Sequence, residues 1–512
     1  MKSVAFHNLG CKVNSYELDI MQQILQKEGY EIVPFDQIAD IYIVNTCTVT
    51  NIADRKSRQM LHRAKQKNPD AVVVAVGCYV QTNADAAAKD SAIDLMIGNN
   101  RKKEIAVLLK EFLEQRAQSQ KQVEPRKESK NPEYEKTMGG TSLIDIAADR
   151  EYEEEILTRT AEHTRAYIKI QDGCNQFCSY CAIPLARGRV RSRHPEKVLE
   201  EIRGIVKAGY REIVLTGIHI SSYGLDFERE KSLAEMISEK TGKEAAAEKA
   251  AAGGLSEGAS DKPLDYKGQS RLIELVELIH DIPGLQRIRL SSMEPRIVTK
   301  EAAEKLASMK KVCPHFHLSL QSGCDATLKR MNRHYTAEQY AYSVEELRNA
   351  YAPVLPAITT DVIVGFPGET EEEFAESREF LRKIGFYEMH IFKYSKRAGT
   401  RAAVMKDQVP EPVKAGRSDE LIALERQQSA EFRRKYLGQS AQVLMEEEKV
   451  IGGKKYLIGH TTDYVRAALP VQSDNSSGPE SGRMHAPNDL VTLKLQDFLT
   501  EDILLGEEIT VF

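Results

Sequence analysis

The sequence predicts a multidomain α/β protein of three parts: an N-terminal α/β domain with a parallel sheet, an open (β/α)6 barrel and a small C-terminal β-barrel. Short apolar runs alternate with amphipathic stretches over most of the chain, which is the pattern of buried parallel strands and covering helices. After a helical stretch at 417–436 the spacing of apolar residues changes to the alternation that is typical of short β-strands. A chain of 512 residues is also too long for one hydrophobic core.

The N-terminal domain is expected over residues 1–112. Its elements are expected to be strands at 3–6, 41–44 and 71–76 and helices at 18–28 and 55–66. Residues 113–159 are mostly Gln, Lys, Glu and Arg, so we expect a connector that is partly ordered at best.

The barrel is expected over 160–418, with an insertion at about 226–270 whose Ala, Glu and Lys composition is typical of a surface loop. Its expected strands are 166–170, 212–216, 287–291, 316–320, 357–364 and 386–392. The small barrel is expected over 435–507. Its strands are expected at 442–445, 455–459, 464–468, 490–495 and 508–512, with a long loop at 471–488.

The composition and the N-terminal residues predict where in the cell the protein is found. There is no apolar run of membrane-spanning length and no signal peptide at the N-terminus, so we expect a cytoplasmic protein without a membrane partner. The net charge of −5 neither favours nor excludes nucleic acid. In a reducing cytosol, most of the eight cysteines are expected to be metal ligands or catalytic groups.

One cysteine set directly follows the first barrel strand. Cys174, Cys178 and Cys181 lie within eight residues, and three thiolates at this spacing can hold an iron–sulfur cluster with one iron left open. Structural zinc normally takes four protein ligands, and no fourth Cys or His is close by. The pattern Cys-x-x-x-Cys-x-aromatic-Cys, with Tyr180 as the aromatic residue, resembles the radical S-adenosylmethionine (SAM) superfamily. This resemblance implies that SAM binds the open iron of a 4Fe-4S cluster.

A second set of three cysteines is spread along the sequence, but each of them occupies the same place relative to an expected strand. Cys11, Cys47 and Cys78 each follow an apolar strand, and the carboxyl ends of parallel strands meet at one edge of a sheet. The three thiols are therefore expected to converge. The alternative is that they are ordinary buried cysteines, as we expect for Cys313 and Cys324.

Together these segments resemble the methylthiotransferases. The resemblance rests on residues 9–17 (LGCKVNSYE), 44–51 (VNTCTVTN) and 174–193. It implies a second 4Fe-4S cluster held by Cys11, Cys47 and Cys78, a radical SAM barrel and a C-terminal TRAM barrel that binds RNA. The residues after Cys11 and around Cys47 resemble the tRNA branch that acts on N6-threonylcarbamoyladenosine at position 37, adding a methylthio group at C2. The sulfur donor and reductant remain unidentified.

SAM contacts are expected at the carboxyl ends of barrel strands. By resemblance the candidates are Thr216, Gly217, Ser292, Glu294, Gln321, Ile363 and Gly365. Thr216-Gly217-Ile218 departs from the superfamily's Gly-Gly-Glu turn, and Asp361 replaces the first Gly of its adenine-binding strand. For each candidate, an ordinary strand end or turn is the alternative.

Two basic runs are candidates for tRNA phosphates. One comprises Arg187, Arg189, Arg191 and Arg193, which we expect to project from the cluster loop. The other lies on the helix at 55–67, where a solvated face is an equal alternative. Residues 436–512 carry six Lys and Arg against twelve Asp and Glu, so an RNA contact there would need a local patch with Tyr456 or Tyr464 stacking on bases.

Three rival functions remain. Two apply the same chemistry to a prenylated adenosine in tRNA or to a ribosomal protein. The third, more distant, is a non-catalytic RNA-binding protein with structural zinc.

Overall fold

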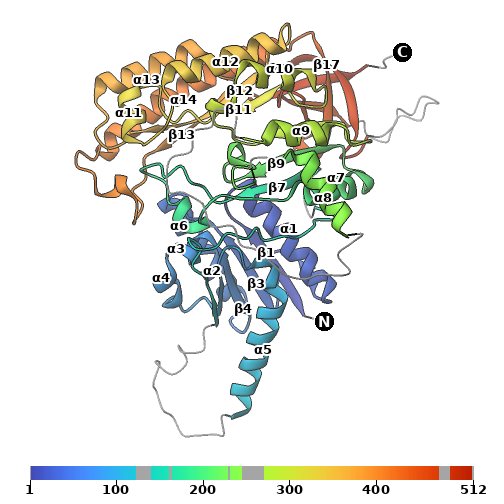
Figure 1. Cartoon of the computed structure of the whole chain (residues 1–512), viewed down its shortest axis with the longest axis vertical. Helices are drawn as coiled ribbons and strands as arrows, with labels where there is room; N and C mark the ends of the chain where they lie inside the picture. Colours follow the sequence, from blue (N-terminus) through green and yellow to red (C-terminus); the bar gives the residue numbers. More distant parts are fainter. Residues whose placement is uncertain are drawn as a thin grey trace, which may run out of the picture.

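The computed structural model describes residues 2–122, 140–160, 164–228, 231–244, 270–471 and 485–509. The N-terminal domain (blue) lies below the barrel (green to orange), and the C-terminal barrel (red) lies beside it (Figure 1). Most of the expected insertion and of the expected loop at 471–488 falls outside the described residues. Within the described ranges, no helix combines the length and the apolar character that a membrane crossing requires.

The N-terminal domain is a parallel sheet in the order β2-β1-β3-β4-β5-β6. Its strands are β1 (Ser3–Asn8), β2 (Glu31–Val33), β3 (Ile41–Thr46), β4 (Val72–Gly77), β5 (Leu95–Ile97) and β6 (Gly140–Ser142). Its helices are α1 (Lys12–Lys27), α2 (Asn51–Lys67), α3 (Cys78–Thr82), α4 (Ala84–Ala88) and α5 (Ile105–Gln122). β3 and β4 are buried along their whole length because helices cover both faces, which explains their unbroken apolar runs. β6 lies in the expected connector and forms the edge of the sheet.

The barrel confirms the predicted open parallel arrangement. Its strands are β7 (Ala166–Asp172), β9 (Glu212–Gly217), β10 (Arg287–Leu290), β11 (His315–His317), β12 (Ala357–Val364) and β13 (Glu388–Lys393). Parallel bridges between the β10 and β11 segments join β7-β9-β10 to β11-β12-β13. A short strand, β8 (Arg191–Ser192), pairs antiparallel with β7. The helices are α6 (Ile183–Arg187), α7 (Pro195–Lys207), α8 (Leu233–Glu244), α9 (Leu272–His280), α10 (Lys300–Ser308), α11 (Asp325–Arg330), α12 (Ala337–Tyr351) and α13 (Glu371–Ile384).

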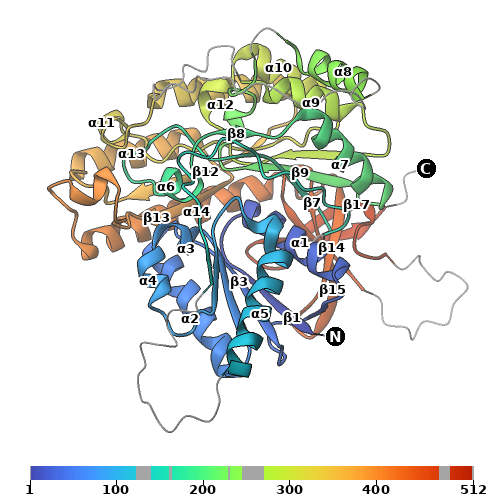
Figure 2. The same ribbon diagram turned by 60° about the horizontal axis from the view of Figure 1, so that its bottom comes forward.

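Helix α1 belongs to two hydrophobic cores. Tyr16 and Ile20 pack in the core of the barrel, whereas Leu18, Met21 and Leu25 pack against the N-terminal sheet. The helix contacts β7 and β9, and Figure 2 shows it between the N-terminal sheet and the barrel. It therefore fixes the position of the N-terminal domain against the barrel.

The C-terminal domain follows α14 (Glu411–Arg434) and is a closed five-stranded barrel. Its strands are β14 (Ser440–Ile451), β15 (Lys454–Thr461), β16 (Arg466–Pro470), β17 (Leu490–Phe498) and β18 (Ile503–Glu508). The last strand was predicted at 508–512; β18 lies earlier and ends at Glu508, and residues 510–512 lie outside the described part of the chain. The domain packs at the amino ends of the large barrel's strands, where Arg287 donates to the carbonyl of His460 at 3.1 Å and Arg289 donates to that of Thr462 at 3.0 Å.

Candidate functional site

The three N-terminal cysteines follow the carboxyl ends of three adjacent strands, β1, β3 and β4. Gly10, with φ of +116°, brings two of their loops together: a Cβ there would lie 3.2 Å from the sulfur of Cys47. Burial raises the pKa of Cys11, and burial and Cys78 raise the pKa of Cys47 to about 12. Cys78 acts electrostatically on both other thiols and Cys11 acts on Cys47, and the Gly10 contact joins two of the loops, so the structure brings the set together as expected.

Two asparagines hold this set in place. The amide of Asn14 donates to the carbonyls of Leu9 at 2.7 Å and of Thr46 at 3.1 Å, which ties the Cys11 loop to the Cys47 loop. The amide of Asn99 donates to the sulfur of Cys78 at 3.4 Å and to the carbonyl of Ala186 on α6 at 2.7 Å. Neither asparagine was singled out from the sequence.

The second set lies in the loop between β7 and α6. Burial and the neighbouring thiols raise the pKa of Cys174 and Cys181, so Cys174, Cys178 and Cys181 also lie near one another. The guanidinium of Arg333 donates to the sulfur of Cys178 at 3.3 Å. Such a contact stabilises a thiolate, which is the form that binds iron.

The two sets are neighbours in space. Helix α3 begins at Cys78 and packs against α6, which follows the Cys181 loop. Arg187, at the end of α6, binds Asn14 at 2.7 Å and acts on the thiols of Cys11 and Cys47.

A buried ionic cluster lies beside the first set. Glu17 contacts Lys102, Lys169 and Arg187, while Asp172 contacts Lys169, Arg187 and Arg191. Burial opposes ionisation of Glu17, but Arg187 and the two lysines hold its pKa well below the ordinary value. In these ion pairs, four buried cations meet two buried carboxylates, so additional negative charge nearby is stabilising. Thiolates at Cys11, Cys47 and Cys78 would supply it, and the site fits an anionic iron–sulfur cluster.

The candidate SAM contacts lie at the strand ends, where they were expected. Thr216, Glu294 and Gln321 are buried, Gly217 and Ile363 are half-buried, and Ser292 is exposed. Gln321 and Gly365 have φ of +73° and +68°, and a Cβ at Gly217 would come within 2.9 Å of the Gln171 carbonyl. Glu294 places one buried carboxylate oxygen with no hydrogen-bond partner 3.6 Å from the imidazole of His219. An uncommitted buried acceptor of this kind fits the ammonium group of SAM.

His219 and Arg333 were missed from the sequence. Burial lowers the pKa of His219 to about 4, so its imidazole is neutral at physiological pH. The sequence could have indicated His219, because it directly follows the Thr216-Gly217-Ile218 turn. Arg333 offered no local signal, because it lies on a different element from the cysteine that it contacts.

Known proteins resemble most of this chain. A model of the radical SAM superfamily matches residues 168–381, and one of Uncharacterized protein family UPF0004 matches residues 3–98. The threonylcarbamoyladenosine tRNA methylthiotransferase of Bacillus subtilis is 38% identical over 93% of this chain and 92% of its own. The chain belongs to the tRNA methylthiotransferase family.

Two further relatives place this methylthiotransferase in its family. A protein named threonylcarbamoyladenosine tRNA methylthiotransferase, from Aquifex aeolicus, is 37% identical over 89% of this chain and 95% of its own. A tRNA-2-methylthio-N(6)-dimethylallyladenosine synthase from Carboxydothermus hydrogenoformans is 33% identical over 85% and 86%. This methylthiotransferase is a radical SAM enzyme that acts on tRNA and uses SAM and 4Fe-4S clusters.

The arginine run of this methylthiotransferase is not the surface that was expected. Arg187, Arg191 and Arg193 are fully buried, and Arg193 pairs with the buried carboxylate of Glu201. Arg189 is half-buried, with its guanidinium over the ring of Phe177 at 4.5 Å. The expectation that Arg187, Arg191 and Arg193 receive phosphates is corrected, because each is buried and contacts a carboxylate from α1, β7, α7 or the connector.

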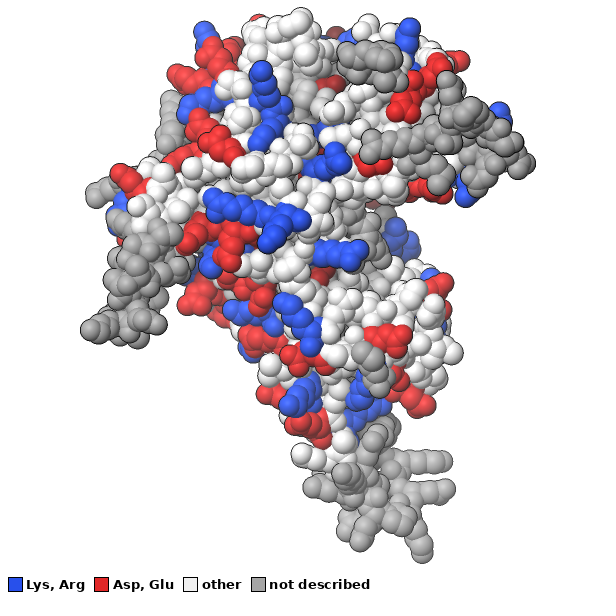
Figure 3. All heavy atoms as spheres, turned by 90° about the vertical axis from the view of Figure 1, so that its right-hand side faces the viewer, with Lys and Arg blue, Asp and Glu red and all other residues white. Residues whose placement is uncertain are grey.

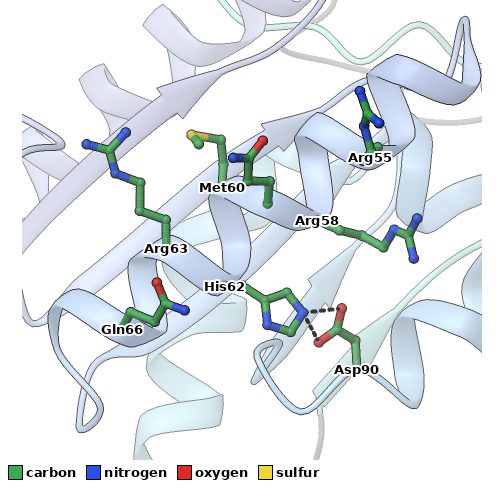
Figure 4. Close-up of a pocket in the computed structure, with 8 residues that line it drawn as sticks. Arg55, Arg58, Met60, His62, Arg63, Gln66 and Asp90 are labelled. Atoms are coloured by element: carbon green, nitrogen blue, oxygen red, sulfur yellow. Dashed lines mark hydrogen bonds and ion pairs between the residues drawn. The ribbon is translucent and has the colours of Figure 1, made fainter.

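The other basic run lies on α2 and lines a surface hollow of about 730 Å³ (Figure 4). Arg55, Arg58 and Arg63 are exposed and have no ion pair among the described residues, whereas His62 pairs with Asp90 at 3.0 Å. By contrast, the face shown in Figure 3 mixes basic and acidic side chains.

In the C-terminal barrel, the ring of Tyr464 stacks between His315 and His460 at 4.6 and 4.5 Å, so it does not offer a free face to a base.

Inside the large barrel, three polar side chains gather on β11, β12 and β13. The imidazole of His317 lies 3.3 Å from the carboxylate of Asp361, and its ring stacks on that of His390 at 5.8 Å. Their donor atoms all lie within 4.8 Å of one another, as a metal site would require. Lys12 acts electrostatically on Asp361 and His390, and this extra positive charge disfavours a bound cation.

Proposed function

We propose that this chain converts N6-threonylcarbamoyladenosine at position 37 of tRNA to its 2-methylthio derivative. The observation that carries the proposal is the near full-length likeness to a protein named for this nucleoside, at 38% identity, against 33% for the relative named for dimethylallyladenosine. Two converging thiol sets on neighbouring elements support it, because methylthiolation needs both a radical source and a site that holds sulfur.

We assign the cluster ligands by position. Cys174, Cys178 and Cys181 would hold the 4Fe-4S cluster that binds SAM, and Cys11, Cys47 and Cys78 would hold the second one. When bound, these groups supply the radical chemistry that an unactivated aromatic C2–H bond requires. The chain supplies the electrostatics: Arg333 donates to Cys178, and Arg187 places positive charge beside Cys11 and Cys47.

The polar groups at the strand ends orient SAM. The uncommitted oxygen of Glu294 would accept from the SAM ammonium group, and neutral His219 holds a hydrogen bond to Ser222 at 2.7 Å without adding charge. Gly217 keeps the turn free of a side chain that would clash with the backbone of β7.

The reconstituted enzyme should discriminate between modified adenosines. With SAM, a reductant and a sulfide source, tRNA carrying threonylcarbamoyladenosine at position 37 should gain a methylthio group, and tRNA carrying dimethylallyladenosine should not. Mass spectrometry of the nucleosides measures both reactions side by side. Equal or greater methylthiolation of the dimethylallyl substrate would assign the chain to the other tRNA branch.

We also propose that the basic surface of α2 binds the phosphate backbone of tRNA. Replacing Arg55, Arg58 and Arg63 together by Gln should weaken tRNA binding and flatten its salt dependence by about 0.7–0.9 in log–log slope per lost contact. Binding is measured at several salt concentrations. A matched triple variant of Lys300, Lys305 and Lys310, exposed on and beside α10, should leave affinity and slope unchanged. If both triple variants behave alike, the tRNA site lies elsewhere.

A further inference from the structure

The loop that follows β13, residues 394–404, joins the last strand of the open barrel to the N-terminal domain. Helix α1 docks the same domain at β7 and β9, near the first strand. Figure 1 and Figure 2 show α2 and α3 on the β13 side of the N-terminal domain and α1 on the β7 side. The N-terminal domain is therefore held at both edges of the open barrel.

Arg397 makes the contact with the N-terminal domain. Its buried guanidinium donates to the hydroxyl of Thr48 at 2.5 Å and to the side-chain oxygen of Asn51 at 2.7 Å. It also pairs with the carboxylate of Asp54, in the first turn of α2, at 2.7 Å. The backbone N–H of Asn51 donates to the hydroxyl of Ser395 at 3.2 Å. A planar guanidinium with three acceptors holds the loop in one geometry against α2.

The acceptors of Arg397 lead to the N-terminal cysteines. Thr48 directly follows Cys47, and its side chain is buried. The hydroxyls of Thr48 and Thr82 lie 3.2 Å apart, and that of Thr82 donates to the carbonyl of Cys78 at 3.0 Å. A chain of hydrogen bonds therefore runs from Arg397, past the residue after Cys47, to the backbone of Cys78.

The same loop contacts the barrel cysteines. The backbone N–H of Ala402 donates to the carbonyl of Ser179 at 2.8 Å, and the guanidinium of Arg401 donates to the carbonyl of Phe177 at 3.0 Å. Both acceptors belong to the loop between β7 and α6 that carries Cys174, Cys178 and Cys181. One short segment thus joins the surroundings of the two cysteine sets.

Methylthiolation requires two sites to act on one carbon atom. By the proposed ligand assignment, the barrel cysteines serve SAM cleavage and the N-terminal cysteines serve the sulfur that is transferred. A misplacement of about 1 Å between reacting groups lowers a rate by on the order of 100-fold. Contacts that fix one site against the other are therefore needed for transfer but not for SAM cleavage itself.

We infer that Arg397 is a positioning residue that fixes the N-terminal cysteines against the barrel cysteines and thereby couples SAM cleavage to methylthiolation. It acts through Thr48 and Asp54 on the N-terminal side and through its own loop on the barrel side. This inference rests on the proposed function and adds to it the contact that keeps the two sites at a fixed separation.

The test measures two products of the full-length reconstituted enzyme with modified tRNA, the 2-methylthio nucleoside and 5′-deoxyadenosine. In Arg397→Gln, iron content and 5′-deoxyadenosine formation should stay at the wild-type level. The 2-methylthio nucleoside formed per 5′-deoxyadenosine should fall by on the order of 10- to 100-fold. Asp54→Asn removes the other half of the ion pair and should lower the same ratio. Arg397→Lys keeps the charge but loses the planar fork, so its ratio should lie between those of Arg397→Gln and the wild type.

The ratio separates positioning from folding. A folding defect lowers both products by the same factor, so a wild-type ratio in Arg397→Gln and Asp54→Asn overturns the inference. A loss of iron in Arg397→Gln also overturns it, because the residue would then support one cluster site alone. Lys396→Gln, exposed in the same loop, is the matched control and should keep the wild-type ratio. If the wild-type enzyme makes no 2-methylthio nucleoside, the proposed function fails and the inference fails with it.

Discussion

Replacing Cys178 by Ala should abolish SAM cleavage and leave about half of the iron. The two thiol sets come from different domains, so loss of one ligand at the barrel loop removes one cluster and spares the other. The Arg333 guanidinium donates to the sulfur of Cys178 at 3.3 Å, a contact that would favour a thiolate ligand there. Iron analysis of anaerobically purified protein and release of 5′-deoxyadenosine measure the two effects.

Cys324→Ala is the matched control for this variant. Cys324 is a buried thiol outside both sets, hydrogen-bonded to Glu376 at 3.2 Å, and its loss should leave iron content and SAM cleavage intact. Retained SAM cleavage in Cys178→Ala would refute the assignment of the barrel loop.

Replacing Cys47 by Ala should preserve reductive SAM cleavage but stop formation of the 2-methylthio nucleoside. Cys47 follows β3 in the N-terminal sheet, and among the described residues no hydrogen bond or ion pair joins its side chain to the loop that carries Cys174, Cys178 and Cys181. The radical source should therefore survive while the sulfur-bearing site is lost. The two activities are measured on one sample by quantifying 5′-deoxyadenosine and the modified nucleoside. If this variant still makes the 2-methylthio product, the second cluster does not carry the sulfur.

The convergence of Cys11, Cys47 and Cys78 was predictable because parallel topology alone brings strand ends together. Each cysteine follows a run of apolar residues, and β1, β3 and β4 are neighbours in the sheet. The central strands of both α/β parts were predictable for the same reason, since buried strands have continuous apolar sequences. β6 was not, because Gly140–Ser142 is a short polar edge strand that pairs with β5 on one side only.

The arginine run shows why the remainder of the site was beyond sequence analysis. Alternating arginines are typical of a solvated or RNA-binding surface when their partners are unknown. Here the partners are Glu17, Glu154, Asp172 and Glu201, and Glu17 is 170 positions away from Arg187. Arg333 and Cys178 are likewise 155 positions apart. Pairings between residues this far apart in sequence form only once the chain has folded, so no local pattern records them.

The sharing of α1 between two cores has a consequence for how the protein is made. A ribosome releases the N-terminal domain before any barrel strand has emerged, and at that stage the face of α1 that carries Tyr16, Glu17 and Ile20 has nothing to cover it. The charges of Glu17 and Lys102 then still lack Lys169 and Arg187. The first three cysteines therefore reach their final surroundings only after the barrel has folded, and the proposed cluster site of the N-terminal domain is complete only at that stage.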